Sequence, residues 1–261
     1  MILIRKNLKE RWICSLLSGE QISASLTAMA FESLKIPAIS LNAFQVKIIT
    51  DSNFGDAKIL KIETDRIKKE LDDNKIVVIT GFQGIDENNN YTTLGRGGSD
   101  TTAVALAATL NADTCEIYTD VNGVYTADPN VVKNAIKLDR VSYDEMLEFS
   151  NCGAGVLHNK CVKIAKDNNV KLVVKSSMSD ESGTIISNYC KKDITGVTSN
   201  YEVVSVIGNN LNEDLKMRIT DRLNEENIKY KKIEQTSRSV SITVNKQDVN
   251  SCVNSLHNLF F

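Results

Sequence analysis

Hydrophobic and polar positions along residues 20–180 follow two alternating patterns, one typical of strands and one typical of helices. Residues 76–80 form a continuous apolar run rich in β-branched side chains, which predicts a strand covered on both faces. Apolar residues at helical spacing between such runs predict amphipathic helices. The predicted strands are 36–41, 46–50, 76–80, 115–118 and 172–174, and the predicted helices are 20–34, 64–72, 99–110, 142–149 and 156–168. This alternation predicts an α/β fold, with a mostly parallel sheet sandwiched by helices.

Two of the predicted helices begin with a capping-box pattern. Ser18 is followed three residues later by Gln21, and Ser142 is followed three residues later by Glu145. In a capping box the serine and the later side chain each accept a hydrogen bond from an otherwise unpaired backbone N–H group. We therefore expect the first helix to begin just after Ser18 and the other to begin at Ser142.

The pattern changes at the short polar segment 187–193. The elements predicted after it are a strand at 203–207, a helix at 212–226, strands at 228–234 and 239–244, and a helix at 247–260. This order is that of a ferredoxin-like α+β module without one strand, which residues 194–198 are positioned to supply. We therefore expect two domains, 1–192 and 193–261.

Composition limits the classes of protein that this chain can belong to. The 261 residues are 42% hydrophobic and carry a net charge of −2, which is typical of a globular protein with a substantial core. Because no global basic field is present, the composition does not favour binding to nucleic acid or to an anionic membrane. Any phosphate group must therefore be bound by a local site.

The cysteines and the apolar runs favour a cytoplasmic protein. Six cysteines are scattered without a C-x-x-C pair, and only 2 histidines accompany them, so neither zinc binding nor a disulfide framework is favoured. We expect reduced, mostly buried thiols and no metal site. No apolar run is long enough for a membrane span, and residues 1–6 do not have the pattern of a signal peptide.

The first candidate site is the glycine-rich segment 81–98, which leads into a predicted helix. Glycines allow backbone N–H groups to approach a ligand closely, and the start of a helix favours an anion. Arg96 adds a planar guanidinium that matches a carboxylate, while Asp100 and Glu20 are suited to an ammonium group. A site with both charges suits an amino acid, although the same glycines are also compatible with a plain tight connection.

The second candidate site is the segment 119–129, which follows the predicted strand 115–118. In open α/β sheets, ligands bind beyond the carboxyl ends of the strands. Asn122-Gly123 and Asp128-Pro129 are also ordinary turn signals, so this segment alone is weak evidence for a site. Two polar segments that each follow a strand favour a shared cleft.

Three motifs taken together carry a family resemblance. Residues 77–84, 92–100 and 118–129 are similar, in order and spacing, to aspartate kinases of the amino acid kinase family. Residues 203–207, 235–237 and 256–261 resemble the regulatory ACT modules of the same enzymes. The resemblance implies transfer of the γ-phosphoryl group of ATP to the side-chain carboxylate of L-aspartate. The product would be 4-phospho-L-aspartate, the first intermediate toward lysine, threonine and methionine.

The resemblance also implies roles for individual residues. Arg96 and Asp100 are the implied catalytic residues, and Arg96 pairs with a carboxylate of aspartate. The implied substrate-binding residues are Glu20, Phe82, Arg96, Gly98, Ser99 and Asp100, and the implied nucleotide-binding residues are Thr119, Asp120 and Tyr125. The implied cofactors are ATP and Mg²⁺. The ACT resemblance implies a homo-oligomer, expected to be a dimer formed through this module, with lysine or threonine as an effector.

The sequence departs from the family pattern at three cationic positions. The Lys-Phe-Gly-Gly motif with which the family begins is not present, Asn130 stands where the family usually has arginine, and Gly155 stands where it usually has lysine. The regulatory region is also short, because Thr195–Thr198 leads almost directly into the second ACT-like segment. These departures indicate a chain that is short at its N-terminus and in its regulatory region.

Three interpretations stay open at this point. The first is an active aspartate kinase, the second is a kinase-like binding or regulatory subunit with weak or no catalysis, and the third is a truncated product that folds poorly. His158 and His257 are both interpreted as structural residues, because neither has an acid–base partner nearby in the sequence.

Overall fold

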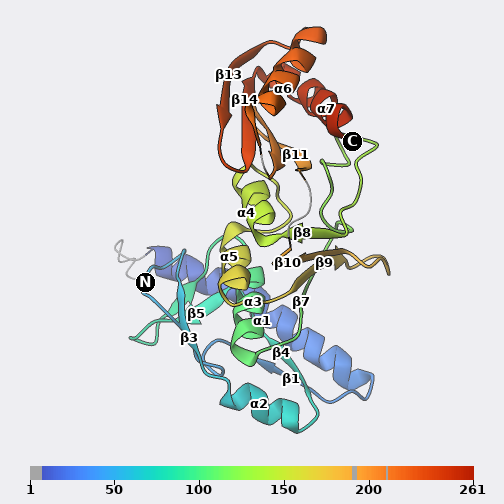
Figure 1. Cartoon of the computed structure of the whole chain (residues 1–261). Coiled ribbons are helices and arrows are strands. Elements are labelled where there is room, and N and C mark those ends of the chain that lie inside the picture. The colour runs from blue at the N-terminus through green and yellow to red at the C-terminus, as the bar shows by residue number, and fades with distance from the viewer. Residues whose placement is uncertain (1–7, 190–192, 210) are drawn as a thin grey trace. The chain divides into compact units, whose positions relative to one another are not determined.

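A computed structural model describes residues 8–189, 193–209 and 211–261, with side chains from residue 16 onward (Figure 1). The described chain divides into two compact units, one ending at Asp113 and the other beginning at Thr114. The domain boundary predicted near residue 192 lies outside the described residues, so the division into 1–192 and 193–261 stays a prediction.

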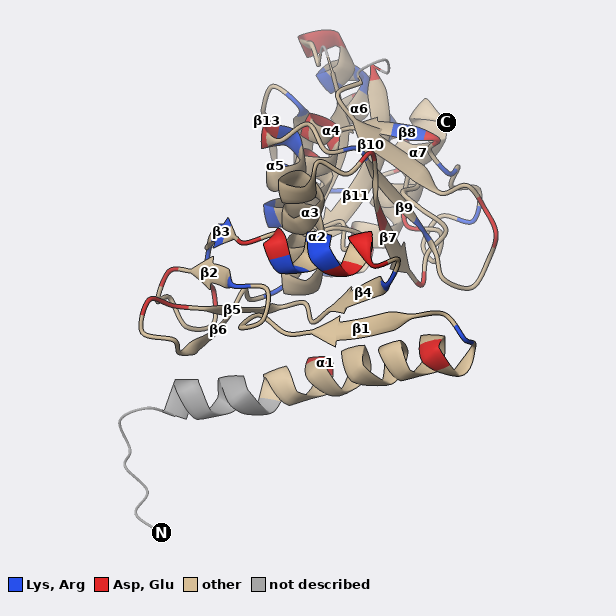
Figure 2. Cartoon of the chain, turned by 90° about the horizontal axis from the view of Figure 1, so that it is seen from below, with Lys and Arg blue, Asp and Glu red and all other residues tan. Residues whose placement is uncertain are grey.

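A long helix, α1 (Leu8–Ser33), begins the first unit. The prediction that this helix begins just after Ser18 is wrong. Ser18 and Gln21 both lie inside α1, and ten residues of helix precede Ser18. Leu17, Ala24 and Ala28 are buried on the face that packs against strands β1 and β4. The described part of α1 carries almost no charge (Figure 2).

The strands of the first unit form two sheets. β1 (Ala38–Leu41) and β4 (Ile76–Ile79) make a parallel pair. The second sheet has the order β3-β2-β5-β6, and its strands are β2 (Ile48–Thr50), β3 (Ile59–Ile62), β5 (Gln83–Ile85) and β6 (Tyr91–Thr93). The segment 81–98 is therefore not one continuous loop, because it contains the β5–β6 hairpin. Helices α2 (Asp65–Asp72) and α3 (Gly98–Leu110) complete this unit.

The second unit begins with a sheet of the order β7-β9-β10-β8. Its elements are β7 (Cys115–Thr119), β8 (Arg140–Ser142), α4 (Tyr143–Asn151), α5 (Asn159–Asp167), β9 (Leu172–Ser176) and β10 (Thr184–Ser187). The capping box at the start of α4 is confirmed. Ser142 Oγ accepts a hydrogen bond from the Glu145 N–H group at 3.1 Å, and Glu145 Oε2 accepts one from the Ser142 N–H group at 2.8 Å.

The pairing of these strands is mixed rather than mostly parallel. The pairs β1–β4, β2–β5, β7–β9 and β8–β10 are parallel, whereas β2–β3, β5–β6 and β9–β10 are antiparallel. The predicted parallel pairing therefore holds where helices connect the strands. The antiparallel pairs are formed by strands that follow one another directly in the chain, because a short loop between them reverses the chain direction.

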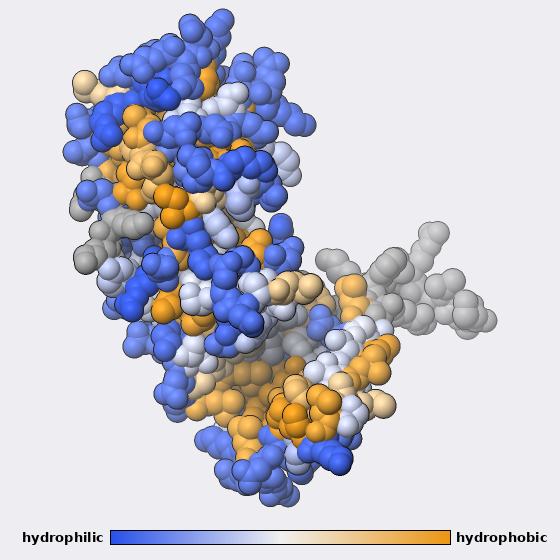
Figure 3. Space-filling view, turned by 90° about the vertical axis from the view of Figure 1, so that its right-hand side faces the viewer, coloured by the Kyte–Doolittle hydropathy of each residue, from blue (hydrophilic) through white to orange (hydrophobic). Residues whose placement is uncertain are grey.

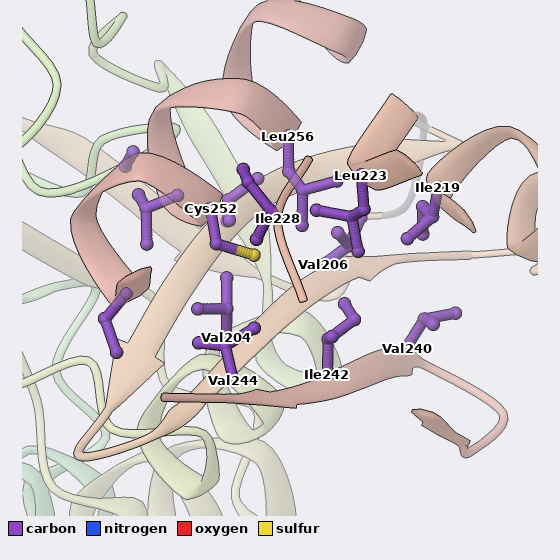
Figure 4. Packing of buried hydrophobic residues seen from close by; sticks show 14 of the residues in the cluster. Val204, Val206, Ile219, Leu223, Ile228, Val240, Ile242, Val244, Cys252 and Leu256 are labelled. Atoms are coloured by element: carbon purple, nitrogen blue, oxygen red, sulfur yellow. The ribbon is translucent and has the colours of Figure 1, made fainter. Parts of the chain in front are cut away.

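The chain ends in a four-stranded antiparallel sheet with two helices. Its elements are β11 (Ile194–Asn200), β12 (Val203–Gly208), α6 (Glu213–Glu225), β13 (Tyr230–Gln235), β14 (Ser239–Val244), a 3₁₀ turn (Lys246–Asp248) and α7 (Val249–Phe260). The strand order is β11-β12-β14-β13, so the prediction that residues 194–198 supply the fourth strand is confirmed. Val206, Ile242, Leu223 and Leu256 lie in a continuous core between this sheet and the helices (Figure 4).

The structure describes the side chains of four of the six cysteines. Cys115, Cys161 and Cys252 are buried and Cys152 is half-buried, as expected for mostly buried thiols. Cys14 and Cys190 lie outside the described side chains. Within the described ranges, no helix combines the length and the apolarity that crossing a membrane requires.

Candidate functional site

A cleft of about 790 Å³ lies at the N-terminal end of α3 in the first unit. Five of the six residues predicted to bind substrate line it, namely Phe82, Arg96, Gly98, Ser99 and Asp100. They come from two places, the turn that follows β4 and the turn that begins α3. The glycine-rich segment therefore brings its predicted side chains together at a helix N-terminus, where unpaired N–H groups favour an anion.

The glycines of this turn are required by its geometry. Gly97, the N-cap of α3, has φ 69°, which is the left-handed region that glycine adopts without steric cost. A Cβ atom at Gly98 would lie 2.6 Å from Cδ2 of Phe82. The start of α3 can therefore approach the Phe82 ring only because residue 98 has no side chain.

Phe82 itself has an unusual backbone conformation. Its φ is 68°, which is rare for a residue with a bulky side chain. The Phe82 N–H group donates a hydrogen bond to Oγ1 of Thr102 at 3.1 Å, and its carbonyl accepts one from the Leu94 N–H group at 3.0 Å. Such strained positions are held by their surroundings and cluster at functional sites, so Phe82 supports a functional interpretation of the cleft.

The charged groups of the cleft have both signs. The Arg96 side chain is exposed and forms no ion pair with any described residue. The carboxylates of Asp56 and Asp100 line the same cleft. A guanidinium can hold a carboxylate through two hydrogen bonds, while carboxylates can hold an ammonium group. The cleft therefore has groups for both charged ends of an amino acid.

Glu20, the sixth predicted substrate residue, lies beside the cleft rather than in its lining. Ser99 Oγ donates a hydrogen bond to Glu20 Oε1 at 3.5 Å, and both residues line an adjoining groove. Glu20 comes from α1 and Ser99 from the first turn of α3, so the tertiary structure brings them together over 79 positions of sequence. A direct contact between Glu20 and a ligand in the cleft stays a prediction.

The loop between β2 and β3 also belongs to this site, although no motif in the sequence predicts it. Four consecutive residues of this loop, Asn53, Phe54, Gly55 and Asp56, line the cleft. Asp51 shapes the loop, because its Oδ1 accepts hydrogen bonds from the backbone N–H groups of Asn53 and Lys58. The signal that could have revealed it is the mostly polar segment 51–56 between the predicted strand 46–50 and the predicted helix 64–72.

A second cavity, of about 290 Å³, lies in the second unit at the end of β7. Thr119 and Asp120, both predicted to bind nucleotide, line it, whereas Tyr125 does not. Tyr125 instead forms an isolated β-bridge with Lys137. Each predicted group of site residues thus lines a cavity within its own unit, apart from Glu20 and Tyr125.

The second cavity has an acidic lining. The carboxylates of Asp120 and Asp128 contribute to it, and its lining residues include no lysine or arginine. Asn130 and Gly155, the two positions where the sequence lacks an expected cation, both belong to this lining. A phosphate group bound here would therefore find backbone and hydroxyl donors, but no cationic side chain from the residues that form the cavity.

Both histidines have structural contacts and line neither cavity. His158 is the N-cap of α5, and its Nδ1 accepts a hydrogen bond from the Lys160 N–H group at 3.4 Å. His257 is fully buried, and its Nε2 lies 2.9 Å from Oγ1 of Thr126. Burial lowers the pKa of His257, because it penalises the charged imidazolium.

The α/β fold and the cleft at a helix N-terminus are consistent with a family that comparison with known proteins identifies. Residues 8–176 match the model of the Amino acid kinase family, and the chain belongs to this family. An aspartokinase of Bacillus sp. (strain MGA3) is 58% identical over 171 residues, and aspartokinase 2 of Bacillus subtilis (strain 168) is 52% identical over the same length. Each match covers 66% of this chain and 42% of the relative, so the chain spans about two fifths of the length of these relatives.

Solved structures of aspartate kinases share the fold. The structure of E. coli aspartokinase III with aspartate and ADP has a TM-score of 0.85 and 20% identity, and the match covers 98% of this chain and 77% of that one. The aspartate kinase of Synechocystis has a TM-score of 0.59 and 35% identity, over 91% of this chain and 42% of its own. These matches extend beyond residue 176, because each covers more than nine tenths of the chain.

Proposed function

We propose that this chain is an aspartate kinase, which transfers the γ-phosphoryl group of ATP to the side-chain carboxylate of L-aspartate and forms 4-phospho-L-aspartate. The observation that carries the proposal is the cleft at the start of α3, where the guanidinium of Arg96 and the carboxylates of Asp56 and Asp100 flank a glycine-rich helix N-terminus. The sequence identity to two aspartokinases supports the same substrate. This reaction is the first step toward lysine, threonine and methionine.

In this proposal the cleft binds aspartate. Arg96 holds one carboxylate of the substrate, and Asp100 and Glu20 hold its ammonium group. Phe82, Gly98 and Ser99 complete the pocket around the substrate. The acceptor carboxylate is already a nucleophile, so no general base is needed, and catalysis consists of positioning and of stabilising charge on the phosphoryl oxygens.

The second cavity is the proposed nucleotide site. Thr119 and Asp120 lie along the nucleotide, and Tyr125 contributes from the neighbouring segment. ATP enters such sites together with Mg²⁺, which neutralises phosphate charge and typically needs only one or two protein carboxylates. Asp120 and Asp128 are the carboxylates of this cavity that fit this requirement.

The C-terminal part is the proposed regulatory part. Residues 193–261 form an ACT-like module beside a kinase domain of residues 1–192, and the ferredoxin-like order of β11 to α7 supports this assignment. Two copies associate through this module in the proposed dimer, and lysine or threonine is the proposed effector. The proposed compartment is the cytoplasm, as for a biosynthetic enzyme whose cysteines show no C-x-x-C pair or disulfide framework in the sequence.

The experiment that tests the proposal is formation of aspartyl hydroxamate from aspartate, ATP, Mg²⁺ and hydroxylamine. Hydroxylamine traps the acyl phosphate, so we expect a hydroxamate signal that requires both ATP and aspartate. Glutamate in place of aspartate is the matched control for substrate. A signal no higher than that of heat-inactivated protein would contradict the proposal for this chain.

A second candidate function is supported by the acidic second cavity. A kinase-like subunit that binds aspartate or a nucleotide without turnover needs no cation at the phosphates, and none comes from the residues that line this cavity. This candidate predicts thermal stabilisation by aspartate or ATP together with no hydroxamate. Absence of any shift with aspartate, ATP or lysine would count against it.

A further inference from the structure

The turn 128–130 forms one wall of the second cavity, and its internal shape is fixed by its own backbone. Asp128, Pro129 and Asn130 all line the cavity. The N–H groups of Val131 and Val132 donate to the Asp128 carbonyl at 3.0 and 2.8 Å, and the Asn130 N–H group donates to Asp128 Oδ1 at 2.8 Å. The position of this turn in the cavity therefore depends on what holds the residues on either side of it.

Thr126, two residues before the turn, is held by two elements from the end of the chain. It is fully buried, and its carbonyl accepts a hydrogen bond from the Val197 N–H group of β11 at 2.7 Å. Its Oγ1 lies within hydrogen-bond distance, 2.9 Å, of Nε2 of His257 on α7. The same hydroxyl oxygen accepts a hydrogen bond from the Ile136 N–H group at 2.9 Å. Both polar groups of Thr126 are thus engaged with β11 or α7.

Helix α7 also holds the chain just after the turn. Asn254 Nδ2 donates a hydrogen bond to the Val131 carbonyl at 3.2 Å. Asn254 precedes His257 by three positions, so the two side chains are neighbours on one face of the helix. Ala127 and Val132, on either side of the turn, are buried in the core that α7 shares with the C-terminal sheet. The surface over this end of the chain is mostly hydrophilic, at the top of Figure 3, which agrees with an apolar interior.

Strand β11 itself forms part of the second cavity. Thr198 and Ser199 line it beside the turn that follows α4. Gly153, in that turn, has φ 108°, and a Cβ atom there would lie only 3.0 Å from the Ser199 carbonyl oxygen. The turn after α4 therefore packs directly on β11. The C-terminal sheet is a wall of the cavity and not a separate neighbour of it.

The hydrogen bond to Thr126 is the polar contact that His257 makes in this core. Its imidazole is fully buried, and Nδ1 has no hydrogen-bond partner among the described residues. Burying a ring nitrogen without a partner costs free energy, which an apolar side chain of similar size would avoid. Packing alone therefore gives no reason for a histidine at this position, whereas the bond to Thr126 does.

We propose that His257 is a positioning residue for the ligand of the second cavity. Through Thr126 it fixes the turn 128–130, and with it the carboxylate of Asp128, against β11. His257 does not line the cavity, so it acts only through this contact. The inference rests on the proposed nucleotide site and adds to that site a residue from the last helix.

The test measures binding of ADP with Mg²⁺ to the 261-residue chain by isothermal titration calorimetry. His257→Leu removes the hydrogen bond but keeps a bulky apolar side chain, and we expect the affinity to fall roughly three- to tenfold. His257→Gln has an amide that reaches the position of Nε2, and we expect an affinity close to the native value. Aspartate binding, which is assigned to the first cleft, is measured on the same samples and should not change.

A double substitution shows whether the effect passes through Thr126. Thr126→Val removes the hydroxyl and should itself weaken binding of ADP with Mg²⁺, and adding His257→Leu should then weaken it little further. Two controls alter the same core without breaking this bond. Ser255→Ala removes a buried hydroxyl of α7 that has no partner among the described residues, and Ile219→Val removes a buried methyl group from α6. Neither control should change the affinity.

Amide hydrogen exchange gives a second measurement that needs no ligand. In His257→Leu, the amides of Val131 and Val132 should exchange roughly threefold faster or more, because the turn that they close is less firmly held. The amide of Ser177, which donates to the Thr119 carbonyl at 2.8 Å on another wall of the cavity, is the internal control and should not change.

Three results would overturn the role of His257. The first is native-like binding of ADP with Mg²⁺ by His257→Leu. The second is an equal loss in Ile219→Val, or no recovery in His257→Gln, because either would indicate a general loss of packing. The third is that the effects of His257→Leu and Thr126→Val simply add. Native protein that binds no ADP with Mg²⁺ would instead contradict the nucleotide site itself, so the two failures are distinguishable.

Discussion

Arg96 is the basic residue in the lining of the first cleft. Its guanidinium is exposed, has no ionic partner among the described residues, and lies with Asp56 and Asp100 in one cleft. Other residues of the cleft act through the backbone. Gly98 allows the start of α3 to approach Phe82, and Phe82 itself is held at a positive φ. At the residue scale, the proposed substrate site therefore depends on Arg96 and on the glycines that allow the helix start to form.

Substitution of Arg96 tests this directly. Arg96→Ala removes a charge-assisted contact of about 1.5–3 kcal/mol, so we expect the affinity or kcat/KM for aspartate to fall by roughly 10- to 150-fold. The melting temperature should be unchanged, because the side chain is exposed. The control is Arg140→Ala, another exposed arginine that does not line this cleft. An unaltered response to aspartate in Arg96→Ala would exclude Arg96 from substrate binding.

His257 predicts a pH dependence of stability. Burial holds its pKa below the ordinary value of about 6.5, so the unfolded state binds more protons as the pH falls through that value. The stability associated with neutral His257 is therefore present above about pH 6.5 and is lost progressively below it. In urea unfolding between pH 7.5 and 5.5, His257→Gln should lose less stability than the native protein. Equal losses in both proteins would contradict this assignment.

The start of α3 is the element on which the first cleft depends. The left-handed N-cap at Gly97 and the missing side chain at Gly98 allow the helix to begin against Phe82. The preceding hairpin β5–β6 fixes the distance between Phe82 and Arg96, because it pairs Gln83 with Thr93. At the element scale, the site is thus a strand, a hairpin and a helix joined by two tight turns.

A pair of glycine substitutions tests this element. Gly98→Ala places a Cβ atom against the Phe82 ring, and overpacking of this kind costs about 1–3 kcal/mol. Gly19→Ala is the control, because a Cβ there meets no atom within 4 Å and alanine stabilises a helix by about 0.5–1 kcal/mol. Chemical denaturation should therefore give changes of opposite sign. A neutral Gly98→Ala would mean that the turn tolerates a side chain.

Within the second unit, the C-terminal sheet is tied to α4 by a polar network. Glu145 is buried and accepts hydrogen bonds from Thr195 Oγ1 at 2.5 Å and from Asn209 Nδ2 at 2.9 Å. Arg238, in the turn before β14, pairs with Asp144 at 2.9 Å. Ser239 Oγ donates a hydrogen bond to Glu148 Oε1 at 2.5 Å. At the scale of the molecule, we therefore expect the C-terminal sheet and the sheet that contains β8 to unfold together.

Glu145→Ala tests this coupling. It leaves the N–H group of Ser142 and the side chains of Thr195 and Asn209 without their acceptor, which should cost about 2–4 kcal/mol. Glu181→Ala removes an exposed ion pair with Lys137 and should cost less than about 1 kcal/mol. In differential scanning calorimetry, Glu145→Ala should lower and broaden the transition of the second unit. A transition of native width and position would show that the network does not couple the sheets.

The sequence by itself determined most of the helices and strands, because a local pattern of residue types specifies each of them. The strand β4, the capping box at Ser142 and the buried face of α7 all follow from spacing and residue type. The motif around Arg96 likewise located five of the six predicted substrate residues in one cleft. Short-range periodicity and backbone chemistry decide these features, so no distant contact is needed to predict them.

The remaining features of the fold and of the site were decided only by the tertiary structure, because they depend on contacts between residues far apart in the chain. α1 begins ten residues before Ser18, and its packing on β1 and β4 stabilises this long helix. Asp56 reaches the cleft from a loop that carries no motif, and Tyr125 does not line the second cavity. The parallel pairing of β4 with β1 is likewise decided by tertiary contacts, because no local pattern in residues 76–79 specifies which strand lies beside them.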